Sequence, residues 1–182
     1  MPLLTVGHGP QDREALGALL TGAGVALLVD VRRFPGSRHN PQYGRPEMEG
    51  WLPEAGIDYV WLQGLGGRRR PAEGSEHVAL RHKAFRAYAD HMESSEFAAA
   101  LDELLDLAGR RRAAVMCSES LWWRCHRRLL ADHLVLVRDV EVLHLMHDGR
   151  TSPHPLTDGV RRGDGRVVYD VGVTSALPGV DG

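Results

Sequence analysis

Short apolar runs alternate with amphipathic stretches along the first 147 residues. The run VALLVDV is apolar nearly throughout, which is typical of a strand buried on both faces of a parallel sheet. The amphipathic stretches repeat apolar residues three or four positions apart, as one face of a helix requires. The predicted strands are residues 3–8, 25–31, 57–62, 113–117 and 141–146. The predicted helices follow Asp12 and cover about residues 47–55, 82–92 and 96–108, and a last one carries Leu129, Leu130 and Leu134.

This alternation predicts an α/β fold, a three-layer sandwich around a mainly parallel β-sheet of about five strands. We expect the first, second and fourth strands at the centre of the sheet, and residues 1–147 to form a single domain. From residue 148 the chain is rich in Gly, Pro and Asp. Residues 148–182 are therefore expected to form a C-terminal extension that packs on the domain or is partly disordered, with residues 166–173 as an edge strand or an ordered tail.

The composition fits one globular domain. Apolar residues make up 43% of the 182 residues and charged residues 25%, which is too apolar for a disordered chain. No apolar run approaches the roughly 20 residues that span a membrane, and the N-terminus lacks the pattern of a signal peptide. With two cysteines a disulfide scaffold is excluded, so we expect a reducing, cytoplasmic location.

The positive charge of the chain is carried almost entirely by arginine. The net charge is -2, which excludes a globally basic nucleic-acid binder, but of the 22 basic residues only Lys83 is a lysine. Guanidinium groups are planar forks that match carboxylate and phosphate oxygens. The composition therefore allows a local site for an anion.

Polar residues that suit such a site follow three of the predicted strands. His8 ends the first strand, Asp30, Arg32 and Arg33 follow the second, and Cys117 and Glu119 follow the fourth. In open α/β sheets ligands bind outside the carboxyl ends of the strands. We therefore expect these side chains to line one crevice.

Five short motifs occur in a characteristic order: TVGHG (5–9), DVRRFPGSR (30–38), the turn at 56–59 leading into LGG (65–67), MCSE (116–119) and CHR (125–127). In order and spacing they resemble the bacterial and archaeal domain-of-unknown-function family numbered 488, over about residues 4–147. The resemblance implies the fold and the place of the site, and it implies no particular chemistry. The family's usual Ser after the first-strand His is Gly9 here.

Cys117 is the strongest candidate for a reactive side chain. A thiol near a helix N-terminus and arginines has a lowered pKa and is nucleophilic, and Arg127 follows ten residues later. The alternative is a buried, inert thiol that closes the strand. Six residues between Cys117 and Arg124 exceed the five of tyrosine-phosphatase loops, and SESLWWR does not match the rhodanese loop. We expect Cys117 to be the more reactive thiol, and Cys125, which lies within or just before the next helix, to be packed.

Other arrangements of the same residues are weaker. Cys117, Glu119, Cys125 and His126 are suitable ligand types for zinc or iron, but their spacing matches no standard site. A disulfide between the two cysteines is disfavoured in a reducing compartment. The histidines at 144, 147 and 154 are irregularly spaced. We expect no metal and no cofactor.

Two hypotheses remain. The first is an enzyme acting on an anionic substrate, such as a nucleotide or nucleic acid, with Cys117 as nucleophile or acid/base, assisted by Glu119, His126 and His8. Phosphate or carboxylate would be held by Arg32, Arg33, Arg38 and Arg127, with Asp30 in the same substrate- and anion-binding site. The second is a non-catalytic module that binds nucleic acid or protein with the same arginines. An enclosed pocket at a reactive thiol favours the first, and a broad open basic face favours the second. We expect no membrane partner, and the sequence does not determine the oligomeric state.

Overall fold

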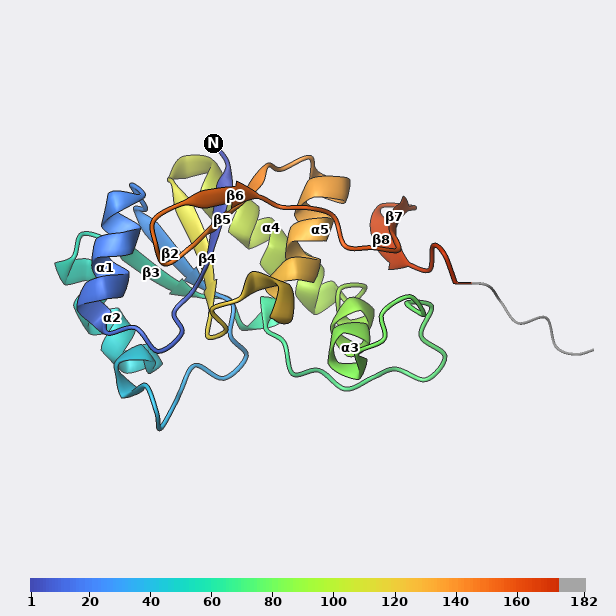
Figure 1. The fold of residues 1–182 in the computed structure, drawn as a ribbon, viewed down its shortest axis with the longest axis horizontal. Helices are drawn as coiled ribbons and strands as arrows, with labels where there is room; N and C mark the ends of the chain where they lie inside the picture. Colours follow the sequence, from blue (N-terminus) through green and yellow to red (C-terminus); the bar gives the residue numbers. More distant parts are fainter. Residues whose placement is uncertain (174–182) are drawn as a thin grey trace, which may run out of the picture.

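The computed structural model, which describes residues 1–173, contains a six-stranded sheet (Figure 1). Its strands are β1 (Leu3–Gly7), β2 (Leu27–Asp30), β3 (Asp58–Trp61), β4 (Ala113–Cys117), β5 (Val142–Leu145) and β6 (Thr151–Pro153). Their order is β3-β2-β4-β1-β5-β6, and only the pairing of β5 with β6 is antiparallel. The predicted mainly parallel sheet, with β1, β2 and β4 inside it, is confirmed.

Helices cover both faces of this sheet (Figure 1). They are α1 (Arg13–Gly22), α2 (Arg45–Glu54), α3 (Lys83–His91), α4 (Ser95–Arg110) and α5 (Arg127–Arg138). Leu16 and Leu20 of α1 and Met48 of α2 pack in one core, and Leu101 of α4 and Leu129 of α5 belong to the core on the other face. The three-layer sandwich is therefore confirmed.

The start of helix α5 decides which cysteine lies at a helix N-terminus. After β4 the chain first makes a single-turn 3-10 helix at Trp122–Arg124, and α5 begins only at Arg127, with His126 as its N-cap residue. Cys117 therefore does not stand at a helix N-terminus. Cys125 does, because it directly precedes the N-cap.

The C-terminal segment continues the fold beyond residue 147. Strand β6 extends the sheet, and β7 (Val160–Gly163) pairs with β8 (Arg166–Tyr169) in a separate hairpin beside α5. Residues 166–169 are thus a strand, but not at the edge of the main sheet. The expected order or disorder of the tail from residue 174 lies outside the described residues. Within residues 1–173 no helix is both long enough and apolar enough to cross a membrane.

The connections diverge at the carboxyl ends of the central strands. The helices that follow β1 and β2 lie on one face, whereas α5, which follows the intervening β4, lies on the other. This divergence opens a crevice above the sheet. The loop after β4 crosses directly over the end of β1, where a Cβ at Gly7 would lie 1.8 Å from the carbonyl oxygen of Glu119. Only glycine fits at this crossing.

Candidate functional site

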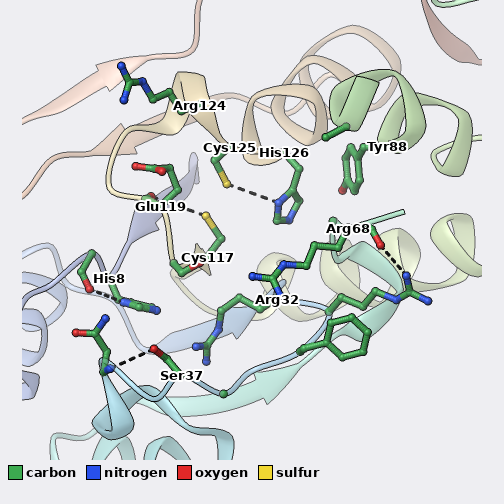
Figure 2. A pocket seen from close by; sticks show the side chains of 18 of the residues that line it. His8, Arg32, Ser37, Arg68, Tyr88, Cys117, Glu119, Arg124, Cys125 and His126 are labelled. Carbon is green, nitrogen blue, oxygen red and sulfur yellow. Dashed lines mark hydrogen bonds between the residues drawn. The ribbon is translucent and has the colours of Figure 1, made fainter. Parts of the chain in front are cut away.

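A cavity of about 390 Å³ lies at the carboxyl ends of β1, β2 and β4 (Figure 2). This volume suits a small molecule. Of the residues selected from the sequence, His8, Arg32, Arg33, Cys117, Glu119 and His126 line it.

Three of the selected residues are not brought to the cavity. Asp30 is fully buried beneath Arg32, and Arg127 is buried behind the Cys117 sulfur. Arg38 is exposed on the loop after β2 and is not part of the lining. These three residues therefore lie outside the cavity lining.

Among the lining residues that were not selected from the sequence as site residues are Arg68, Tyr88, Arg124 and Cys125. Arg68 directly follows the LGG motif and Arg124 directly precedes the CHR motif. Adjacency to those motifs was the available signal for both. Tyr88 lies in α3 within an ordinary amphipathic pattern, and nothing in that pattern marks it.

Two free thiols stand together at one wall of the cavity (Figure 2). Cys117 ends β4 and Cys125 follows the 3-10 turn, which returns the chain to the same place. The two residues are 2% and 5% exposed, and each sulfur influences the ionisation of the other. The chemistry of the site therefore belongs to the pair.

His126 is oriented as a base toward Cys125. Its Nε2 lies 3.0 Å from the carbonyl oxygen of Val31 and its Nδ1 lies 3.6 Å from Cys125 Sγ. A carbonyl can only accept, so Nε2 carries a proton and Nδ1 of the neutral ring faces the sulfur as an acceptor. Cys125, His126 and the Val31 carbonyl thus form a nucleophile, a base and a group that orients the base. Gly67 leaves room for this ring, since a Cβ there would lie 3.0 Å from Nδ1.

Arg127 is a buried cation whose acidic neighbours are the two thiols. Its guanidinium is 1% exposed and donates from Nε to Cys117 Sγ at 3.0 Å, and from its other nitrogens to the Glu119 carbonyl oxygen and to Thr5 Oγ1. No carboxylate among residues 1–173 forms an ion pair with it. A buried charge without a partner is costly. A thiolate is the anion this position favours.

The surroundings place that negative charge on Cys125. Burial and the neighbouring Cys125 thiol raise the pKa of Cys117. Burial alone would also raise the pKa of Cys125, but Cys117, His126 and Arg127 lower it. The first backbone N–H of α5, at Arg127, also points to Cys125 Sγ at 3.5 Å, as in other thiols activated at helix N-termini. These contacts favour Cys125, and not Cys117, as the more reactive thiol.

His8 offers the cavity an unprotonated nitrogen. Its ring stacks on Tyr43 at 4.0 Å, and Nδ1 donates to the Gly9 carbonyl oxygen at 2.7 Å. Burial is the main cause that lowers the pKa of His8 to about 4, so the ring is neutral at pH 7. Within residues 1–173 the buried Nε2 has no hydrogen-bond partner. It is placed to accept a hydrogen bond from a ligand.

Arginines dominate the charge of the lining. Arg32 is held in a buried two-pronged pair with Asp30, at 2.8 and 2.6 Å, and serves largely as scaffold. Arg33, Arg68 and Arg124 carry the remaining positive charge, and Glu119 is the acidic residue of the lining. The cavity is therefore positive at its rim, as an anion site requires. The described part of the chain contains no group of three or more side chains placed to hold a metal ion.

Comparison with known proteins gives one match. A family model described as "Domain of unknown function DUF488" matches residues 12–134. This range holds the thiol pair, the residues after β2 and the start of α5, whereas His8 precedes it. No curated protein and no solved structure matches the chain.

Proposed function

The chain belongs to the DUF488 family of domains of unknown function, and on that premise we propose that it is an enzyme that attacks an anionic substrate with a cysteine thiolate. The observation that carries the proposal is the buried Arg127, whose acidic neighbours are Cys117 and Cys125. An inert structural thiol gains nothing from a buried cation at this distance. A nucleophile that must ionise near neutral pH does.

Each lining residue then has a role. His126 accepts the proton of Cys125, and the Cys125 sulfur forms a bond to an electrophilic atom of the substrate while the bond from that atom to its leaving group breaks. The leaving group departs with the proton from His126. Cys117, which stays protonated, supports the thiolate and serves as acid/base. His8 accepts a hydrogen bond from the substrate, and Glu119 is the further acid/base group at the rim.

The anionic class of substrate is supported by Arg33, Arg68 and Arg124 at the rim. A nucleotide or a phosphate-bearing fragment of similar size suits the cavity volume. A concave cavity beside the thiol pair, in place of a flat basic face, supports this proposal over a binding module.

The rim charge can be tested without knowing the substrate, by comparing alkylation with anionic iodoacetate and with neutral iodoacetamide. We expect Arg124→Gln to lower the iodoacetate-to-iodoacetamide rate ratio about fivefold, since one charge at short range contributes on the order of 1 kcal/mol. Arg38→Gln is the matched control, because Arg38 lies outside the lining. A ratio that is unchanged in Arg124→Gln, or that falls equally in Arg38→Gln, would contradict an anion site.

A further inference from the structure

A chain of hydrogen bonds leads from the thiol pair into the core. Arg127 donates to Thr5 Oγ1 at 3.3 Å, and Thr5 Oγ1 lies 2.6 Å from His144 Nδ1. His144 Nε2 lies 2.9 Å from His154 Nδ1, and His154 Nε2 lies 2.8 Å from the Asp132 carboxylate. These hydrogen bonds join strands β1 and β5, the segment after β6, and helix α5.

All the side chains of this hydrogen-bond series are shielded from water. Thr5, His144 and Asp132 are buried, and the His154 side chain is fully buried as well. The Trp122 ring stacks on the His144 ring at 4.1 Å. Water cannot substitute for a missing partner here. Each hydrogen bond of the series must therefore have one donor and one acceptor, which fixes the position of every proton.

The Asp132 carboxylate sets these proton positions. It only accepts, so His154 donates from Nε2. In the neutral tautomer that this leaves, Nδ1 of His154 accepts, and His144 then donates from Nε2. Burial is the main cause that lowers the pKa of His144 to about 3, so its ring is neutral and its Nδ1 accepts the Thr5 hydroxyl proton. The Thr5 oxygen then turns its lone pairs to Arg127.

We propose that Asp132, acting through His154, His144 and Thr5, is a positioning residue that aims the Arg127 guanidinium at the Cys117 sulfur. The proposal rests on the proposed function, because it supplies the support for the thiolate. If these proton positions are lost, the Thr5 hydroxyl proton is free to turn toward Arg127, where two donors oppose each other. Arg127 then holds the thiol pair less firmly, and the pKa of the reactive thiol rises.

Other groups also act on the thiols and must stay unchanged in the test. Those that face the pair or line the same cavity are Arg127, His126, Arg124 and Glu119, with Arg32, Arg33, Arg68, His8 and Tyr88 from the other elements. None of them is altered in the variants below.

The role of Asp132, at the end of the hydrogen-bond series far from the thiols, is tested by two variants with the same change of charge. In Asp132→Asn the side-chain oxygen is kept toward His154, because the Thr157 N–H, 2.9 Å from the same oxygen, requires an acceptor there. Asp132→Leu removes the acceptor. Loss of a negative charge by itself would lower the thiol pKa in both variants. We expect a higher thiol pKa in Asp132→Leu only, by about half a unit, or about threefold slower iodoacetamide alkylation near neutral pH.

The Thr5 end supplies a second comparison, which tests the last link to Arg127 and stays available if Asp132→Leu fails to fold. Thr5→Val removes the hydroxyl and should raise the thiol pKa by a similar amount, whereas Thr5→Ser keeps the hydroxyl and should restore the wild-type profile. Equal profiles for Thr5→Val and Thr5→Ser, with a lowered thiol pKa in the wild type, would overturn the positioning role alone. A wild type whose thiols both ionise at or above the ordinary pKa would overturn the proposed function instead.

Discussion

Replacing Cys125 with serine should slow iodoacetamide alkylation at pH 7 by roughly a hundredfold, as expected when the reacting thiol has a pKa about two units higher. The thiol that remains is Cys117, whose pKa is raised by burial. It keeps Arg127 but lacks the His126 ring and the N–H at the start of α5, which face Cys125. Peptide mapping of the labelled protein measures the effect at each sulfur.

Cys117→Ser is the matched variant, because it removes the other sulfur of the same pair. Its Cys125 retains His126 and the Arg127 N–H, so fast alkylation should persist, within a few-fold of the wild type. Fast labelling of the Cys125→Ser variant and slow labelling of the Cys117→Ser variant would assign the reactive thiolate to Cys117 and contradict the arrangement described above.

The second large effect is expected for Arg127→Met. The thiol pKa should rise to or above the ordinary value of about 8.5, because the buried cation is lost. Loss of one partner of a buried, hydrogen-bonded charge pair typically costs about 3–5 kcal/mol of unfolding free energy. Here the thiolate can take up a proton, so the full loss is expected only at alkaline pH.

The sign of the pH dependence follows from linkage. The folded-state pKa of Cys125 lies below its unfolded value, so the unfolded state binds more protons between the two values and stability rises with pH there. That stabilisation is lost as pH falls through the folded pKa. The difference between wild type and Arg127→Met should therefore shrink toward low pH, which urea unfolding at several pH values measures.

Arg128→Met is the control for the loss of an arginine from the same helix. Arg128 donates to Thr157 Oγ1 at 2.8 Å and contacts neither sulfur. Its removal should leave the alkylation profile unchanged. A stability loss in Arg127→Met that matches that of Arg128→Met at every pH would contradict a buried thiolate partner.

The fold could be predicted from the sequence because buried strands and helix faces appear in it as runs and repeats of apolar residues. The apolar runs at 25–31 and 113–117 mark central strands, and the rule on strand ends locates His8, Arg32 and Cys117 at one cavity. These inferences depend on residues next to each other in sequence or on a general property of parallel sheets.

The remaining features depend on the path of loops, which spacing does not encode. The 3-10 turn at Trp122–Arg124 returns Cys125 to Cys117, so the thiol expected only to be packed also lines the cavity. Arg127 and Arg38 both looked suited to an anion, but only the three-dimensional path shows that one turns inward and the other stays in solvent. The link from Asp132 to His144 joins residues from separate elements that carry no shared pattern.

The central claim is that one sulfur of the pair is ionised near neutral pH. Thiolate absorbance near 240 nm, followed against pH in the wild type and in Cys125→Ser, tests it most directly. The account predicts that one thiolate per chain of the wild type forms well below pH 8.5, and that this step is absent in Cys125→Ser. A wild-type titration in which both sulfurs stay protonated up to pH 8.5 would contradict it.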